Sequence, residues 1–184
     1  MRQNEEDTTM TSALAGSAAK VRLPTYNPAG ARPCPFKAED TTPLAWWRKL
    51  PSQAFGEPER LHLRATLEQI NVLHAGHDLA AALKGDVGAA IDVTFTLMPM
   101  NELSLRTDIA MTALLRCARE RNASASLVLA QVLGLTDLGH PYAQELATSW
   151  LAYGRLYSES PRKFSNAGAV LLTAFQEHQR EQDA

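Results

Sequence analysis

The segment "SASLVLAQVLG", residues 124–134, is apolar almost all the way round when it is drawn as a helix. A helix without a polar face has to be covered by other elements on every side. Ser124 or Ser126 can cap its first turn, and Gly134 marks its end. The segment therefore predicts a central, buried helix around which the rest of the chain is arranged.

Apolar residues at three- and four-residue spacing on both sides of this segment predict amphipathic helices. Asn101 is expected to cap the helix before it, Pro141 to begin the helix after it, and Gly76 to interrupt a longer upstream pattern. The expected helices cover residues 42–51, 58–85, 101–121, 142–157 and 160–184. The prediction is a mainly α-helical fold, with one compact domain of about five to seven helices over residues 41–184.

The stretch "AIDVTFTLM", residues 90–98, fits two kinds of secondary structure. Its apolar and polar residues alternate, which is typical of a half-buried strand. The spacing of Val87, Ile91 and Phe95 fits a helix as well. Pro99 ends either element. The sequence leaves a short strand and a helix open at this point.

Residues 1–40 differ from the rest of the chain because they are rich in proline and carry no helical pattern. Each proline fixes φ and removes a backbone donor, so this stretch is predicted to be an extended or disordered arm. Tyr26 and Phe36 give it more apolar content than a solvated linker needs. Two interpretations stay open, a loose tail or an arm that lies along its own domain or along a partner.

The composition is that of an ordinary globular domain, with 184 residues, 45% hydrophobic residues and a formal net charge of −2. This charge argues against a strongly basic nucleic-acid scaffold but leaves room for a local basic patch. Cys34 and Cys117 neither make a disulfide framework nor have the spacing of a zinc site. Without a signal-peptide pattern or a run of about 18 apolar residues, the protein is expected to be cytoplasmic, outside the membrane and free of cofactors.

Trp46 and Trp47 are adjacent in a short helical segment that begins at Pro43. Neighbours on a helix point about 100° apart, so a small element cannot bury both on one face. One tryptophan is expected to anchor the segment while the other lies at the margin, against the arm, a second subunit or a partner. The alternative is that both are wedged between helices of the same domain. With Tyr26 and Phe36, the two tryptophans form the predicted partner-binding set.

Residues 92–134 read as an alternating stretch, a helix, a polar turn and a second helix. In this order they resemble the ribbon-helix-helix DNA-binding proteins, in which paired strands of a dimer enter the major groove. The resemblance implies that Thr94 and Thr96 face the bases. Asp92 departs from the pattern, since an acidic residue is unfavourable near phosphates. The cations at the end of the first helix, including Arg119 and Arg121, either approach phosphates or complement the C-terminus of that helix.

A second basic stretch is "RLYSESPRK", residues 155–163, which contains Tyr157 and follows Tyr153 closely in the sequence. Aromatic rings beside cations can bind phosphates or stacked bases. The same residues can equally be ordinary packing between helices.

The motif "HAGHD" places His74, His77 and Asp78 within one or two helical turns. Such spacing can supply metal ligands or a histidine–carboxylate pair for proton transfer. No second cluster completes a site, so the competing interpretation is a histidine pair at the edge of an amphipathic face.

No stretch matches the nucleophile, phosphate-loop or dinucleotide-binding motifs. Together with the arm and the paired tryptophans, this favours a non-enzymatic interaction, regulatory or accessory protein, such as a subunit of a larger assembly. It would act through contacts with a protein partner or with itself. The alternatives are a small dimeric DNA-binding regulator and a metal-dependent enzyme.

Overall fold

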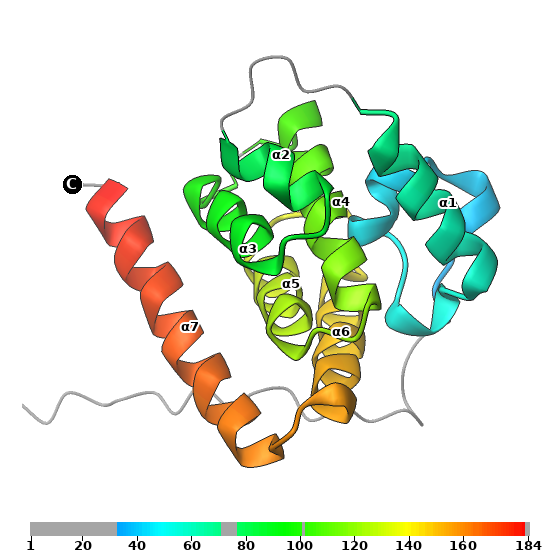
Figure 1. Ribbon diagram of the computed structural model, residues 1–184. Helices are drawn as coiled ribbons and strands as arrows, with labels where there is room; N and C mark the ends of the chain where they lie inside the picture. Colours follow the sequence, from blue (N-terminus) through cyan, green and yellow to red (C-terminus); the bar gives the residue numbers. More distant parts are fainter. Residues whose placement is uncertain (1–32, 71–76, 101, 183–184) are drawn as a thin grey trace, which may run out of the picture.

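The computed structural model describes residues 33–70, 77–100 and 102–182, and over these ranges the chain forms helices and no strand (Figure 1). Three short 3-10 helices come first, η2 (Ala38–Asp40), η3 (Pro43–Arg48) and η4 (Ser52–Ala54). They are followed by α1 (Glu57–Glu68), α2 (His77–Leu83), α3 (Val87–Thr96), α4 (Leu105–Arg119), α5 (Ala123–Leu135), α6 (Ala143–Tyr157) and α7 (Pro161–Gln182). The prediction of a mainly helical, compact fold is confirmed. In the described part of the chain, no helix has both the length and the apolar character needed to cross a membrane.

Helix α5 lies at the centre of the fold and packs against α3, α4, α6 and α7 (Figure 1). Leu129, Val132 and Leu133 on this helix are fully buried. The central, buried helix expected from its apolar sequence is therefore present. Its cap is Asn122, whose side-chain oxygen accepts from the backbone N–H of Ala125 at 2.9 Å.

Neither of the two serines predicted to cap α5 is its cap. Ser126 is buried in the helix and donates its hydroxyl to the backbone oxygen of Asn122 at 2.9 Å, while Ser124 is exposed in the first turn. At the other end, α5 continues to Leu135, one residue beyond Gly134. Asn122 acts as the cap because it directly precedes the first turn, where its side chain reaches a free backbone N–H.

Most of residues 90–98 belongs to α3, so the strand alternative is wrong. Asp86 caps this helix by accepting from the N–H of Ala89 at 2.8 Å. The hydroxyls of Thr94 and Thr96 donate to carbonyls of the preceding turn, at 2.8 Å each. An isolated strand would leave its backbone groups without partners, and the described residues offer no second strand, whereas a helix pairs these groups internally.

The starts of α4 and α1 use local side-chain caps. Ser104 caps α4 by accepting from the N–H of Thr107 at 3.1 Å, whereas the predicted cap, Asn101, lies outside the described residues. At α1, the N–H of Gly56 donates to the Glu59 carboxylate at 2.7 Å. Both arrangements give a hydrogen-bond acceptor to a backbone N–H that has no carbonyl partner within the helix.

The segment before α1 is tied to both α4 and α6. Helix η3 packs against α4. The N–H of Ser52 donates to Ser149 Oγ at 2.7 Å, and the indole of Trp150 donates to the Leu50 carbonyl at 3.4 Å. These contacts join positions that are 97 and 100 residues apart in the sequence, so the segment forms part of the domain.

Cys117 is a packing residue of α4. It is fully buried, and burial, with a smaller contribution from the Glu120 carboxylate, raises the pKa of its thiol to about 11. Arg116 opposes this shift only in part. A thiol that stays protonated at neutral pH is a poor nucleophile. Cys117 therefore contributes volume to the core and no reactive group.

Gly154 marks the closest approach of α6 to its neighbours. A Cβ at this position would lie 2.8 Å from Cζ of Phe164 on α7 and 2.9 Å from Cβ of Ser126 on α5. Changing Gly154 to alanine is expected to lower the free energy of unfolding by about 1–3 kcal/mol, because two packed helices have to move apart. Urea denaturation measures this change.

Gly134 provides the matched control for this substitution. A Cβ there would lie 3.9 Å from Cβ of Ala147, an ordinary contact. Changing Gly134 to alanine is expected to leave stability unchanged or to raise it by about 0.5–1 kcal/mol, because alanine has the higher helix propensity. Equal effects of the two substitutions would contradict the tight packing at Gly154.

Candidate functional site

Both adjacent tryptophans are buried, which makes the expectation of one outward-facing tryptophan wrong. Trp46 is 2% exposed and Trp47 is 0% exposed. The indole of Trp46 donates to the carbonyls of Ala38 and Thr41, at 3.2 Å each, while that of Trp47 donates to the Asp108 carboxylate at 2.8 Å. The two indoles have different neighbours: Trp46 also lies edge-on against the rings of Phe55 and His62, with centroids 5.7 and 5.6 Å away, whereas Trp47 contacts α4. The pair is therefore wedged inside its own domain.

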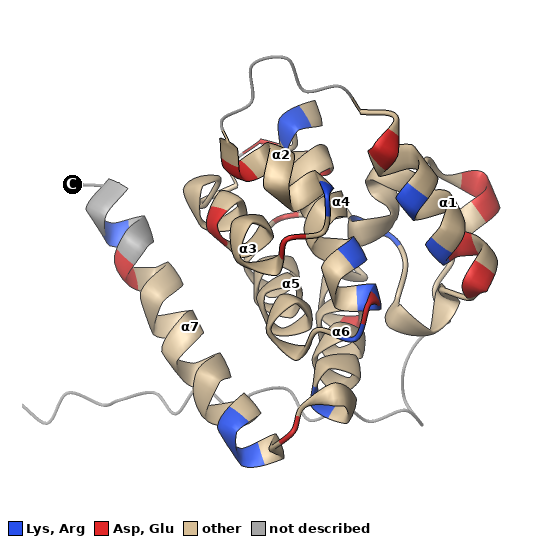
Figure 2. Ribbon diagram, viewed as in Figure 1, with Lys and Arg blue, Asp and Glu red and all other residues tan. Residues whose placement is uncertain are grey.

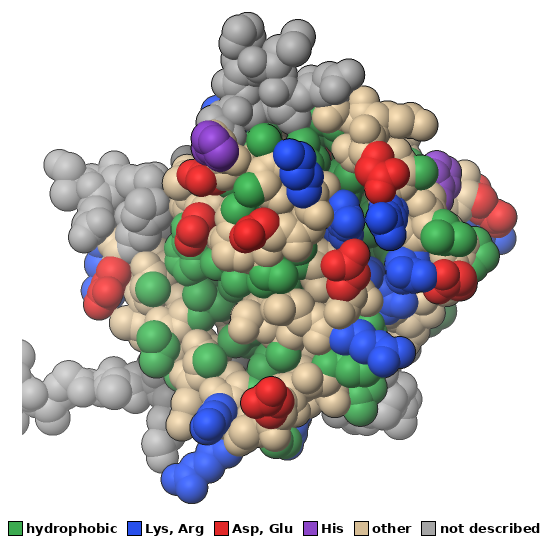
Figure 3. All heavy atoms as spheres, viewed as in Figure 1, with side chains coloured by type: hydrophobic (Ala, Val, Ile, Leu, Met, Phe, Trp, Pro, Cys, Tyr) green, Lys and Arg blue, Asp and Glu red, His purple; other side chains and the backbone are tan. Residues whose placement is uncertain are grey.

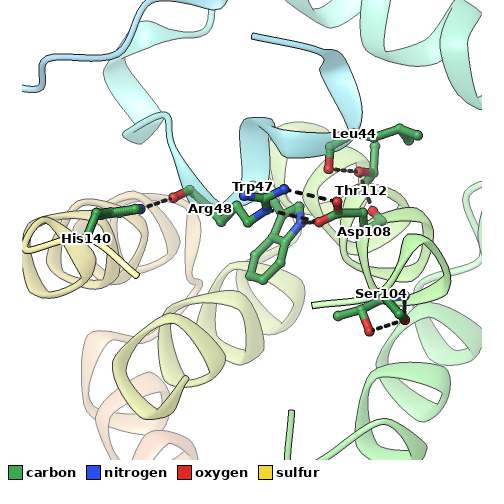
Figure 4. A network of polar contacts seen from close by, with 8 residues as sticks. Leu44, Trp47, Arg48, Ser104, Asp108, Thr112 and His140 are labelled. Atoms are coloured by element: carbon green, nitrogen blue, oxygen red, sulfur yellow. Dashed lines mark hydrogen bonds and ion pairs between the residues drawn. The ribbon is translucent and has the colours of Figure 1, made fainter. Parts of the chain in front are cut away.

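Figure 4 shows the polar network that fixes this segment. Arg48 makes two hydrogen bonds to the Asp108 carboxylate, from Nε at 3.1 Å and from Nη2 at 3.2 Å. His140 Nε2 lies 2.8 Å from the Arg48 carbonyl (Figure 4). One carboxylate on α4 thus holds both the indole of Trp47 and the guanidinium of Arg48. The network has the character of a structural anchor.

Phe36, the third predicted partner-binding residue, is half-buried against the same region. Its ring centroid lies 5.2 Å from that of His140 and 6.1 Å from that of Tyr142, and Lys49 Nζ lies 5.3 Å from the ring. Tyr26, the fourth, lies outside the described residues. The described members of the predicted partner-binding set are therefore engaged in contacts within the domain.

The residues of the DNA-binding alternative do not form the expected face. Thr94 is fully buried in α3, whereas Thr96, the last residue of the same helix, is exposed. Because residues 90–98 are helical, the paired strands of a ribbon-helix-helix protein are missing from the described chain. Arg119 and Arg121 lie instead beside Tyr153 and other residues of α1 and α6.

The residues of the metal-binding alternative are only partly described. His77 and Asp78 are exposed in the first turn of α2, while His74 and Gly76 lie outside the described residues. Across the described ranges, no group of three or more histidine, cysteine, aspartate or glutamate side chains is placed to hold a metal ion.

A group of cations lies between α1 and the C-terminal end of α4 (Figures 2 and 3). We call this depression the α1–α4 groove, and it consists of two pockets. The tyrosine pocket is lined by Gly56, Glu57, Arg60, Arg119, Glu120, Arg121, Tyr153 and Tyr157. The leucine pocket is lined by Arg64, Leu67, Glu68, Ile70, Ala80, Leu83, Lys84 and Arg116.

The two pockets are neighbours along both helices. Arg60 and Arg64 lie one turn apart on α1, and the ion pair between Arg116 Nε and Glu120, at 3.2 Å, bridges the pockets on α4. Six of the sixteen lining residues are Lys or Arg and three are Glu, although the whole chain has a net charge of −2. Figure 3 shows the resulting band of Lys and Arg side chains on this face. The groove is positive on a mildly acidic protein.

Arg119 forms the fixed floor of the tyrosine pocket, which has a volume of about 600 Å³. Its two terminal nitrogens donate to the carbonyls of Ser52 at 3.3 Å and Phe55 at 2.9 Å. Its guanidinium carbon lies 5.4 Å from the Phe55 ring centroid and 5.0 Å from that of Tyr153. Nε is buried and has no hydrogen-bond partner among the described residues. The guanidinium is therefore held rigidly between two rings.

Arg121 closes α4 in a conformation that glycine usually adopts. Its φ is +68°, its N–H donates to the Ala118 carbonyl at 3.1 Å, and the next N–H, from Asn122, donates to the Cys117 carbonyl at 3.3 Å. This is the Schellman arrangement, in which the left-handed residue is most often glycine. The exposed guanidinium of Arg121 lies 5.2 Å from the Tyr157 ring centroid.

The carboxylates of the tyrosine pocket are already paired. Glu57 accepts from Arg60, with one of the two bonds from Nε at 2.9 Å, and Glu120 pairs with Arg116. These pairings leave Arg119 and Arg121 without a carboxylate partner among the described residues. The pocket thus carries an excess of positive charge.

Tyr153 supplies a neutral hydroxyl at the same pocket. Burial, which outweighs the opposing effect of Arg119, raises the pKa of the phenol. The hydroxyl donates to the Arg119 carbonyl at 3.4 Å. Because the phenol stays protonated over the physiological range, Tyr153 adds no negative charge that would oppose an anion.

The leucine pocket, with a volume of about 420 Å³, adds an apolar base to the groove. Leu67 and Leu83 are buried there and Ile70 is half-buried. Arg116 is fixed because its Nη1 donates to the Leu83 carbonyl at 2.9 Å, whereas Lys84 is exposed at the rim. An apolar side chain surrounded by acidic groups is the complement of this pocket.

The sequence indicated part of this site for a different reason. Tyr153 and Tyr157 do lie beside cations, but these are Arg119 and Arg121 of α4 and not the basic residues of 155–163 that follow in the sequence. The sequence did not indicate that Arg60 and Arg64 of α1 belong to a site, because two arginines four residues apart are common on any exposed helix.

Comparisons with protein-family models, with curated proteins and with solved structures find no match.

Proposed function

We propose that this protein is an interaction module that binds an acidic segment of a protein partner in the α1–α4 groove. The observation that carries the proposal is the excess of six cations over three carboxylates in a groove of a chain whose net charge is −2. Complementary charge favours encounter with an acidic segment and fixes its orientation.

The leucine pocket narrows the chemistry of this partner. Its apolar base, with Leu67 and Leu83, suits an aliphatic side chain, and Lys84 at its rim suits a flanking carboxylate, while Arg64 is paired with Glu68 at 2.9 Å. A short segment that alternates acidic and aliphatic residues meets both requirements, since a helix or an extended chain can lay such a face into a groove. A regulatory or accessory role follows from binding without a chemical step.

The probe for this proposal is a fluorescein-labelled peptide of glutamate and leucine, compared with a lysine–leucine peptide of equal length. Fluorescence anisotropy is expected to show binding of the glutamate peptide only, with affinity that falls as salt is added, because surface charges are screened. The double substitution Arg60→Glu and Arg64→Glu is expected to weaken binding about tenfold or more, which corresponds to about 1.4 kcal/mol.

The matched control is the double substitution Arg162→Glu and Lys163→Glu, which makes the same charge change in the first turn of α7, outside the groove. This variant is expected to bind like the unchanged protein. Equal loss in both variants would show non-specific attraction and contradict the proposal. Tighter binding of duplex DNA than of the glutamate peptide would assign the groove to nucleic acid and overturn it as well.

A further inference from the structure

We infer that the tyrosine pocket is a phosphoryl-binding subsite that takes a phosphorylated side chain of the bound segment. This inference rests on the proposed function, since it adds a specificity element to the same groove. The cations that carry it, Arg119 and Arg121, have no carboxylate partner among the described residues. The carboxylates nearby, Glu57 and Glu120, are neutralised by other arginines.

Arg119 supplies a fixed positive charge beneath the pocket. Its terminal nitrogens are engaged by the Ser52 and Phe55 carbonyls, and these neutral acceptors leave the charge of the guanidinium uncompensated. The rings of Phe55 and Tyr153 pack against it, and its Nε is buried. A charge in such surroundings interacts more strongly with a nearby anion than an exposed charge does. The dianionic phosphoryl group gains more from this field than a carboxylate does.

Arg121 supplies the cation that can reach a ligand directly. The left-handed backbone at φ +68° favours glycine, and an arginine there is a strained choice for a helix end. The strain places an exposed guanidinium over the Tyr157 ring at the rim of the pocket. An observed backbone outlier of this kind points to a role for the side chain beyond ending the helix.

The remaining lining groups suit an oxyanion with several acceptor oxygens. Arginine forks and phenol hydroxyls donate to phosphate oxygens. The volume of about 600 Å³ accommodates a side chain with its phosphoryl group and part of the flanking chain.

The experiment compares the glutamate–leucine peptide carrying a central serine with the same peptide carrying phosphoserine. Anisotropy is expected to show at least tenfold tighter binding of the phosphopeptide. Arg121→Gly is expected to remove this preference, because it weakens binding of the phosphopeptide more than that of the serine peptide, and to cause no fall in the melting temperature. Arg162→Gln, a cation lost outside the pocket, is expected to keep the preference.

Titration with inorganic phosphate, followed through the ring resonances of Tyr153 and Tyr157, tests the pocket without any peptide. Displacement of the phosphopeptide by inorganic phosphate alone, at comparable concentration, supports the phosphoryl chemistry and assigns the site to free phosphate. Equal binding of serine and phosphoserine peptides overturns the inference and leaves the proposed function in place. Absence of peptide binding with a preserved phosphate response defeats the proposed function and supports the phosphoryl site. A phosphopeptide preference that survives Arg121→Gly overturns the assignment to this pocket.

Discussion

Replacing Trp47 with alanine is expected to lower the free energy of unfolding by about 3–5 kcal/mol, the range observed for large aromatic residues removed from cores. Trp47 is a 0% exposed residue of η3, the helix that packs against α4. The substitution removes its packing and also the 2.8 Å hydrogen bond to the Asp108 carboxylate. Chemical denaturation followed by far-UV circular dichroism measures the loss, because the signal comes from the helices and not from the deleted ring.

Two further variants separate packing from hydrogen bonding at this position. Trp47→Phe keeps most of the apolar contact and loses the indole donor, so its cost is expected to be about half of that of Trp47→Ala. Leu61→Ala, at a side chain that is 55% exposed on α1, is the surface control and is expected to change stability by less than about 0.5 kcal/mol. A Trp47→Ala variant as stable as the surface control would show that η3 is not part of the cooperative core.

Replacing Asp108 with alanine is expected to lower the free energy of unfolding by about 2–4 kcal/mol, because it leaves a buried indole N–H and a half-buried guanidinium without their shared acceptor. Asp108 accepts from Trp47 and from Arg48, with three hydrogen bonds in total between 2.8 and 3.2 Å. It also stands in the first turn of α4, where a negative charge favours the helix.

Asp108→Asn distinguishes the two partners of this carboxylate. The amide oxygen can still accept from Trp47, but the charge that pairs with Arg48 is lost, so a smaller decrease of about 1–2 kcal/mol is expected. A double-mutant cycle of Trp47→Phe with Asp108→Ala is expected to give a coupling energy of about 0.5–3 kcal/mol. Strict additivity of the two substitutions would contradict a direct interaction between these side chains.

The sequence allowed the mainly helical fold and its central helix to be predicted because those features depend on local pattern. Residues 124–134 are apolar on all sides, and such a helix has only one suitable place in a small domain. Its cap was less predictable, since Asn122, Ser124 and Ser126 all offer a side-chain oxygen. Only the actual course of the chain before the first turn decides which one reaches a free N–H.

At residues 90–98 the local sequence pattern was not enough to predict the secondary structure. Their alternation suits a strand, but a strand depends on a partner strand elsewhere in the chain, whereas the helix begins from the nearby cap at Asp86. The tryptophan pair shows the same limit. A short element cannot bury Trp46 and Trp47 by itself, and their burial depends on Ala38, on Thr41 and on a carboxylate 61 positions away.

The α1–α4 groove was the least accessible feature from sequence. Its tyrosines on α6 and the arginines at the end of α4 lie in separate stretches of the sequence, each with its own local interpretation. What joins them is the packing of α6 beside the end of α4, where Arg119 lies against Tyr153. The left-handed backbone at Arg121 gave no signal, because the residue most often found at such a position is glycine.

The bonds from Ser52 to Ser149 and from Trp150 to Leu50 have a consequence for synthesis of the chain on the ribosome. The first described segment leaves the exit tunnel long before α6, the helix that holds it in place. At about 5–20 residues per second, roughly 5–20 seconds pass before its binding partners are available. During this interval Leu50 and Ser52 lack the partners that α6 provides, so the nascent segment has only the earlier helices, chiefly α4, to pack against.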